Sequence, residues 1–150
     1  MAREKAAAIA AVQNRESYVV LAADTTVVID GDILGKPESL PDGLSILSRL
    51  SGRSHTVITA LCLHTPEGVT SKSVETSVQF AHLDQSVCEA YLATEEPWDK
   101  AGAYAIQGLG GVFVKEIRGS YSNVVGLPLT ETWQLLLQQG IPTILDRRHE

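Results

Sequence analysis

Apolar and polar residues near the start of the chain follow the pattern of a strand that turns back on itself. An apolar run over residues 18–23 predicts a buried strand, and β-branched residues over 26–29 resume the pattern after Asp24. Asp30 and Gly31 form a strong hairpin signal, because both residue types accept the positive φ of a tight turn. We therefore expect Asp24 at the end of a buried strand, followed by a hairpin.

Apolar residues recur at helical spacing over residues 2–13, over residues 40–50, after Asp84 and over residues 129–137. The second of these segments has clear boundary signals, with Pro41 in its first turn and Gly52 just past its end. Lys5 lies at the edge of the apolar face of the first helix, where a lysine commonly packs its stem and keeps its charge in water. The last helix is expected to bury an apolar face formed by Leu129, Trp133, Leu136 and Leu137.

β-branched and alternating patterns predict three more strands, over residues 56–64, 74–80 and 112–117. The first two are joined by a short turn and are expected to form a long hairpin with one solvated face. Residues 97–111 form a segment of small residues, of the kind that lets a backbone approach a ligand closely. The glycines at its end lack the spacing of a dinucleotide fingerprint and the Gly-Lys-Ser/Thr of a P-loop, so both of those folds are rejected.

Length and composition predict one domain over residues 1–150, because a chain of this size with 44% apolar content can bury one ordinary core. A formal charge of -6 without a basic block argues against a nucleic-acid surface. The longest apolar run is far too short for a bilayer span and no leader pattern precedes it, so we expect a cytoplasmic protein without membrane contact. Cys62 and Cys88 have no metal-ligand spacing and are expected to be reduced and structural.

Asp24 and Lys36 are the first candidates for chemistry. The expected hairpin returns Lys36 towards Asp24, and a base beside a cation suits attack by water on a phosphate. The competing interpretation is that Asp24 is a turn or helix-cap residue, which is the more common role of an aspartate after a strand. The four histidines are scattered, so a zinc site is not expected and any metal should be held by oxygen.

Six short motifs occur in order along the chain: Ala23-Asp24-Thr25, Gly35-Lys36-Pro37, Leu50-Ser51-Gly52-Arg53-Ser54-His55, Asp99-Lys100-Ala101-Gly102-Ala103-Tyr104, Ile106-Gln107-Gly108 and Gly119-Ser120-Tyr121. Together they resemble the Maf family, also called septum-formation inhibitors. The resemblance implies a nucleoside triphosphate pyrophosphatase, which releases pyrophosphate, leaves the monophosphate and uses a divalent cation such as Mg²⁺ or Mn²⁺. It also implies a homodimer and an α/β fold similar to inosine triphosphatases, with a twisted mixed sheet flanked by helices and a cleft between two lobes.

The resemblance also implies roles for particular residues. Asp24 would be the proton acceptor and a candidate metal ligand, while Lys5 and Lys36 would hold phosphates. Asp99 and Lys100 also match the family pattern, but their spacing assigns them no role.

Thr25 and Gln107 would set which base is accepted. Their motifs look like the branch of the family that acts on dTTP and UTP, rather than the branch that hydrolyses 7-methyl-GTP. A glutamine amide fits that choice, since its donor and its acceptor can match the O4 acceptor and N3 donor of uracil or thymine. Ala105 stands where the family usually has glycine, and we expect the loop to tolerate this methyl group.

Family members usually begin with a strand and a loop reading Ser-Ala-Ser-Pro-Arg-Arg, which this sequence lacks. We therefore expect an N-terminally truncated domain that binds phosphate more weakly, because forked guanidinium groups grip phosphate oxygens in pairs. The leading hypothesis is a dTTP and UTP pyrophosphatase. The alternative is a non-catalytic nucleotide-binding or regulatory fragment of the same fold.

Overall fold

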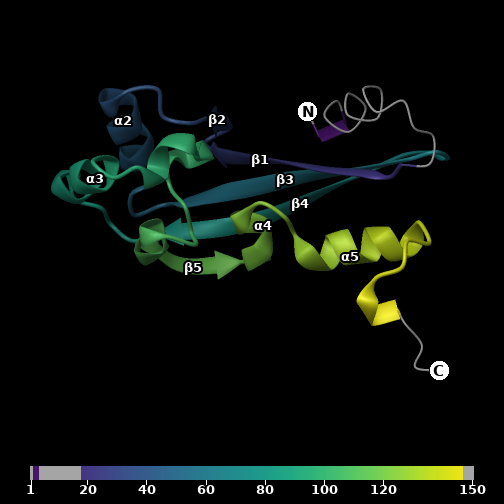
Figure 1. The fold of residues 1–150 in the computed structure, drawn as a ribbon. Coiled ribbons are helices and arrows are strands. Elements are labelled where there is room, and N and C mark those ends of the chain that lie inside the picture. The colour runs from purple at the N-terminus through teal and green to yellow at the C-terminus, as the bar shows by residue number, and fades with distance from the viewer. Residues whose placement is uncertain (1, 4–17, 147–150) are drawn as a thin grey trace.

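A five-stranded sheet runs through the part of the chain that the structure describes, residues 2–3 and 18–146 (Figure 1). The structure is a computed structural model. The strands are β1 (Val20–Ile29), β2 (Asp32–Leu34), β3 (Ser54–Thr65), β4 (Gly68–Phe80) and β5 (Val114–Arg118), in the order β2-β1-β3-β4-β5. Every pairing between these described strands is antiparallel, where a mixed sheet was expected, and short turns make hairpins of β1–β2 and β3–β4.

β1 is one continuous strand, so the expectation that a strand ends at Asp24 was wrong. Asp24 pairs with Ala60 of β3, and Thr25 pairs with Thr59. The sequence pattern breaks at Asp24, but β3 supplies regular partners on both sides of this residue. Strand formation depends on such neighbours more than on the preference of one residue, and the strand therefore continues.

Helices flank this sheet, as expected for an α/β fold (Figure 1). Between residues 18 and 146 they are α2 (Leu40–Leu50), α3 (Gln85–Leu92), α4 (Tyr121–Val125) and α5 (Leu129–Gln138). Shorter 3₁₀ turns are η1 (Glu96–Asp99), η2 (Ala101–Ala103), η3 (Leu109–Phe113) and η4 (Ile144–Asp146). α2 and α3 gather at one end of the sheet, while α5 lies along the other end. In the described part of the chain, no helix is both long and apolar enough to cross a bilayer.

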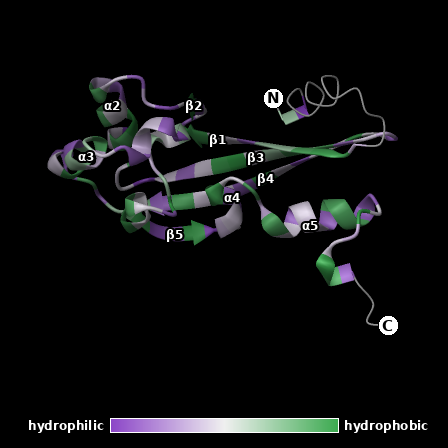
Figure 2. Ribbon diagram, viewed as in Figure 1, coloured by the Kyte–Doolittle hydropathy of each residue, from purple (hydrophilic) through white to green (hydrophobic). Residues whose placement is uncertain are grey.

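The main core fills the space between one face of the sheet and helices α2 and α3. Val27, Val57 and Val78 come from three neighbouring strands and meet Leu47 and Leu50 of α2. Buried positions alternate with less buried ones along most of β3 and the second half of β4, as a sheet with one packed face requires. Figure 2 shows hydrophobic stretches along β1 and β3. Cys62 and Cys88 are both buried in hydrophobic clusters and form no disulfide with each other, so both pack as core side chains; their reduced state stays a prediction.

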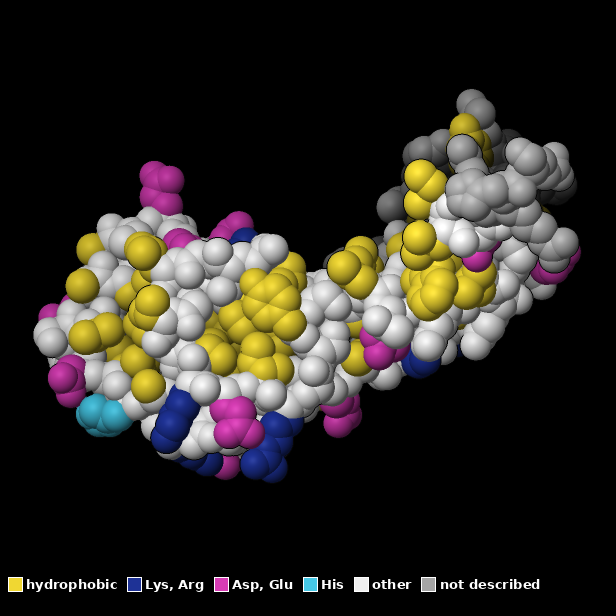
Figure 3. All heavy atoms as spheres, turned by 90° about the horizontal axis from the view of Figure 1, so that it is seen from below, with side chains coloured by type: hydrophobic (Ala, Val, Ile, Leu, Met, Phe, Trp, Pro, Cys, Tyr) yellow, Lys and Arg dark blue, Asp and Glu magenta, His cyan; other side chains and the backbone are white. Residues whose placement is uncertain are grey.

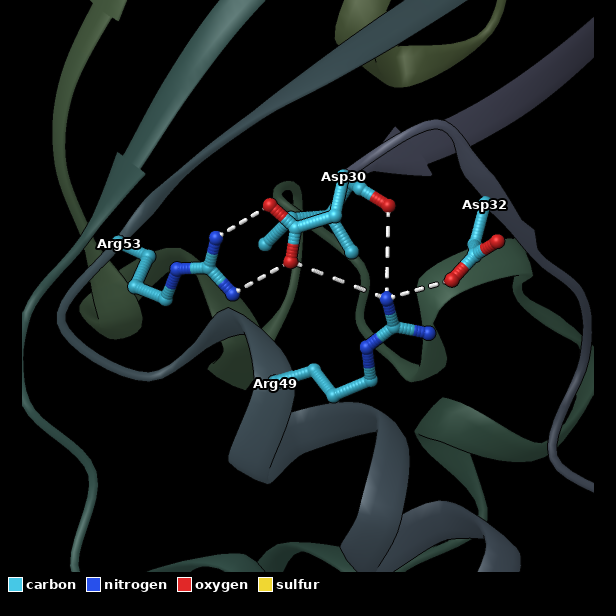
Figure 4. Close-up of polar contacts among 5 residues, drawn as sticks. Asp30, Asp32, Arg49 and Arg53 are labelled. Carbon is cyan, nitrogen blue, oxygen red and sulfur yellow. Dashed lines mark hydrogen bonds and ion pairs between the residues drawn. The ribbon is translucent and has the colours of Figure 1, made fainter.

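The β1–β2 turn is held against α2 by an ion-pair network (Figure 4). Asp30 and the glycine after it have φ values of 52° and 79°, as the hairpin signal predicted. Arg53 binds both carboxylate oxygens of Asp30, at 2.9 and 2.6 Å, and its hydrogen bond lowers the pKa of the Asp30 carboxyl. Arg49 of α2 binds Asp32 at 2.9 Å. These contacts fasten the hairpin to the last turn of α2 and to the turn that follows α2.

α5 buries a different face from the one that its sequence predicted. Three residues expected to be buried are exposed, Leu129 by 61%, Trp133 by 38% and Leu137 by 41%. The buried residues of α5 are Thr132 and Leu135, and Leu135 packs with Leu136 against Leu61 of β3. The helix therefore meets the sheet along a neighbouring stripe, and hydrophobic side chains reach the surface on the face seen in Figure 3.

Candidate functional site

Residues from distant parts of the chain meet around one pocket of about 270 Å³. Its polar lining contains five residues that the sequence singled out, which are Thr25, Lys36, Asp99, Lys100 and Gln107. Its apolar walls are formed by Val27, Val57, Ala101, Tyr104, Ala105, Ile106, Val124 and Val125. The pocket thus joins β1, the loop after β2, the small-residue segment and α4. Lys5 lies outside the described residues.

Thr25 forms a polar patch on the floor of the pocket and links β1 to α4. Its Oγ1 lies 2.9 Å from Oγ1 of Thr59 and 3.5 Å from the carbonyl oxygen of Gly126, so its single proton is donated to the nearer partner, Thr59. Thr59 donates in turn to the carbonyl of Asn123 in α4, at 3.2 Å. The Thr25 hydroxyl is therefore oriented by a chain of hydrogen bonds that ends in the backbone of α4.

Asp24 directly precedes Thr25 in the sequence, yet Asp24 is not among the described residues that line the pocket. Successive side chains of a strand point to opposite faces, so the pleat separates Asp24 from Thr25. The face of Asp24 is shared by Ala22 and Cys62, which pack together. Pairing of β1 with β2 begins only at Val27, so Asp24 precedes the part of β1 that β2 covers.

Two cations stand at the mouth of the pocket, on loops that are tied together. Lys36 follows β2, and Lys100 follows η1, where its Nζ lies 3.4 Å from a carboxylate oxygen of Asp99. Gly102 donates its N–H to the carbonyl of Gly35 at 3.1 Å and so joins the two loops. Gly102 has φ of 74°, and an added Cβ would lie 3.0 Å from a β1 side chain. Glycine at this position allows the loops to approach the sheet.

Gln107 lies on a loop, residues 105–110, that is tied to the end of α3. Tyr91 of α3 accepts the N–H of Ala105 at 3.1 Å and donates its hydroxyl to Glu96 at 2.5 Å. Glu96 accepts two more N–H groups further along the loop. Neither Tyr91 nor Glu96 stands out in the sequence as a candidate site residue. Tyr91 has the spacing of a core residue and Glu96 the composition of a turn, so no pattern indicates their shared contact.

A buried histidine supports the wall that Tyr104 forms. His55 Nε2 lies 2.8 Å from Tyr104 Oη, and both rings contact Phe80 edge to face. Burial lowers the pKa of His55 to about 4 and raises the pKa of Tyr104. Both side chains are therefore neutral at pH 7, and the charge of the pocket lining comes from its lysines and Asp99.

Comparison with known proteins assigns the chain that forms this pocket to a family. A family model described as Maf-like protein matches residues 1–139. The chain belongs to the Maf-like family. This membership and the α/β fold confirm the resemblance found in the sequence.

Relatives of this Maf-like protein carry the name dTTP/UTP pyrophosphatase. One from Shewanella oneidensis is 50% identical over 142 residues, which cover 94% of this chain and 73% of the relative. One from Anaeromyxobacter dehalogenans is 47% identical over 151 residues, covering 98% of this chain and 75% of the relative. One from Acinetobacter baylyi is 50% identical over 136 residues, covering 91% and 73% respectively.

The described part of this Maf-like chain offers oxygen ligands singly rather than as a cluster. No group of three or more His, Cys, Asp or Glu side chains that could hold a metal occurs among the described residues. A complete protein-built metal site is therefore not formed by this part of the chain. Single carboxylates fit only an ion that brings other ligands with it, as Mg²⁺ does when it binds one or two carboxylates together with substrate phosphates.

Proposed function

We propose that the chain hydrolyses dTTP and UTP to their monophosphates and pyrophosphate. The observation that carries the proposal is the meeting of Thr25, Gln107 and two lysines in one pocket. Relatives about half identical to this chain are named for that activity.

The pocket suits both the base and the triphosphate of a pyrimidine nucleotide. Gln107 offers an amide donor and acceptor to the edge of the base, and the Thr25 hydroxyl adds a fixed polar group on the floor. Lys36 and Lys100 stand at the mouth, where their charges can offset those of a triphosphate in a protein that is itself negative. Lys5, outside the described residues, is proposed as a further phosphate ligand.

We assign proton transfer to Asp24. In the proposed step a water oxygen bonds to the α-phosphorus, the bond to the bridging oxygen breaks, the proton of the water passes to Asp24, and pyrophosphate leaves. For Asp24 to act in this step, the triphosphate must pass around β1 ahead of Val27, where β2 does not pair with it. A divalent cation, Mg²⁺ or Mn²⁺, held by the phosphates and by Asp24, would neutralise phosphate charge.

The decisive experiment compares two carboxylates of which only one lines the pocket. Asp24→Asn should lower kcat for dTTP by at least about 100-fold and leave nucleotide affinity largely unchanged, because it removes a proton acceptor. Asp99→Asn is the matched control, which should mainly raise KM because it changes the partner of Lys100. Pyrophosphate release and calorimetric titration measure the two effects. Parent-like turnover by Asp24→Asn, or loss of turnover in Asp99→Asn alone, would contradict the assignment.

The second candidate is a protein that binds the same nucleotides without hydrolysing them. It is favoured by one observation, that Asp24 is absent from the described lining of the pocket. Steady release of pyrophosphate by the parent chain excludes it, and tight binding without release supports it.

The homodimer, the cytoplasmic location and the single domain stay predictions. The exposed apolar stripe of α5, formed by Leu129, Trp133 and Leu137, is a described surface that would suit a second copy of the chain.

A further inference from the structure

The Tyr91–Glu96 pair grips both ends of the loop that carries Gln107. At the first end, the hydroxyl of Tyr91 accepts the N–H of Ala105 at 3.1 Å. At the other end, the carboxylate of Glu96 accepts the N–H of Leu109 and the N–H of Gly110, each at 2.9 Å. The Tyr91 hydroxyl also donates to Glu96, so the two grips are joined.

Ile106 and Gln107 lie between the two grips, and both line the pocket. The contacts of Tyr91 and Glu96 are made to backbone N–H groups, so they fix the course of the loop whatever its side chains are. Neither Tyr91 nor Glu96 is among the described residues that line the pocket. Their influence on a bound base is therefore exerted through the position of residue 107.

The glycines of this loop show how closely it approaches the pair. A Cβ added at Gly108 would lie 1.8 Å from a carboxylate oxygen of Glu96. A Cβ at Gly110 would lie 2.8 Å from the hydroxyl of Tyr91 and from the carbonyl of Ala105. Side chains at these positions would push the loop off its two grips.

The protonation states of Tyr91 and Glu96 strengthen the hydrogen bonds that hold the loop. Tyr91 is buried, and burial together with the hydrogen bond to Glu96 raises the pKa of its hydroxyl, which stays a donor. Burial opposes the charge on Glu96, but the hydrogen bonds from Tyr91, Gly110 and Leu109 outweigh it and lower the pKa of this carboxyl. Hydrogen bonds to an ionised acceptor are about twice as strong as neutral ones.

We propose that Tyr91 and Glu96 are positioning residues that set base selectivity by fixing the backbone on either side of Gln107. This inference rests on the proposed function, in which Gln107 contacts the base. A glutamine amide can rotate to match the edge of uracil or that of cytosine. The placement of its backbone must therefore supply part of the discrimination between UTP and CTP.

Two variants remove the grip, and each has a control of the same chemistry. Glu96→Gln removes the charge, and Glu95→Gln makes the same change one residue earlier on an exposed side chain with no described hydrogen bond. Tyr91→Phe removes the hydroxyl, and Tyr121→Phe removes an exposed hydroxyl of α4. Amide hydrogen exchange at Ala105, Leu109 and Gly110 reports the grip without requiring activity.

Both loop variants should exchange these three amides faster than the parent, and neither control should. The ratio of kcat/KM for UTP to that for CTP should fall by about tenfold in Glu96→Gln and Tyr91→Phe, since one aligned hydrogen bond to the base is worth about that factor. A role in stability alone would lower kcat/KM for both nucleotides equally. Faster exchange with an unchanged ratio, or an equal loss for UTP and CTP, would overturn the proposal.

The test separates this proposal from the proposed function. If the parent releases no pyrophosphate, hydrolysis is disproved, and the ratio of Kd values for UTP and CTP takes the place of the kinetic ratio. A fall of that ratio in both loop variants still supports the grip. An unchanged ratio, or a parent that binds neither nucleotide, overturns it.

Discussion

Gln107 combines a donor and an acceptor in one side chain, and a single substitution changes that pattern without changing its size. Gln107→Glu replaces the donor by an acceptor, which would face O4 of uracil or thymine. We expect a loss of about 1 to 3 kcal/mol in transition-state binding, largest for UTP and dTTP. Measured kcat/KM values for UTP, dTTP, CTP and GTP test this, with Gln139→Glu on the exposed end of α5 as a charge-matched control. An unchanged ranking of the four nucleotides would count against a role in selectivity.

Sequence reasoning could identify the pocket residues because they lie in recognisable motifs. Thr25, Lys36 and Gln107 belong to three separate motifs, and the structure brings them together. Reasoning failed for Glu96, whose role comes from contacts with N–H groups 13 and 14 residues further along. Almost every residue has a backbone N–H group, so a contact with one leaves no recognisable pattern in the sequence.

At the scale of elements, α4 shows how a buried polar side chain can define a helix. α4 has only five residues, which are too few for a helix to be stable alone. Asn123 is fully buried, and the two N–H protons of its amide are shared among the carbonyls of Val57 and Val74 and Thr76 Oγ1. The sheet therefore supplies the stability that the local sequence lacks.

Asn123→Ala should lower the free energy of unfolding by about 3 kcal/mol, because it leaves buried acceptors on β3 and β4 without a donor. It should also loosen Val124 and Val125, which line the pocket, and so weaken nucleotide binding. Chemical denaturation and calorimetric titration measure these effects. Thr130→Ala on the exposed side of α5 is the control and should change neither. A parent-like midpoint for Asn123→Ala would show that α4 is held by other contacts.

The strands and longer helices were predictable from apolar spacing and turn residues, with two errors that share one cause. β1 continues through Asp24, and α5 buries Leu135 instead of Leu129 and Trp133. In both elements the neighbouring strand β3 decides the outcome. Periodicity describes one segment at a time, so it cannot show which partner that segment meets.

At the scale of the whole molecule, His55 links stability to pH. Burial lowers its pKa to about 4 in the folded protein, against about 6.5 in an unfolded chain. Below pH 6.5 the unfolded chain therefore binds a proton that the folded chain does not accept. The free energy of unfolding should fall as the pH falls from 6.5 to 4, by up to about 3 kcal/mol.

Denaturation curves at several pH values, together with an NMR titration of the histidine rings, measure this dependence. His55→Gln should remove most of it, whereas His82→Gln, at an exposed position, should not. Carboxyl groups with lowered pKa, such as those of Asp30 and Glu116, also contribute to the free energy of unfolding. That contribution is lost at a more acidic pH than the contribution of His55. A His55 ring that titrates near 6.5 in the folded protein would disprove the assignment.

The approach of Gly108 to Glu96 also constrains how this sequence can change over generations. A carboxylate oxygen of Glu96 occupies the position that a Cβ at residue 108 would need, so every substitution there displaces Glu96 from the loop. Loss of Glu96 would in turn remove the steric reason for glycine at 108. The two positions are thus coupled in the manner of a double-mutant pair, where the second change costs less after the first. Substitution at residue 108 is therefore expected to cost less in chains that no longer have a carboxylate at residue 96.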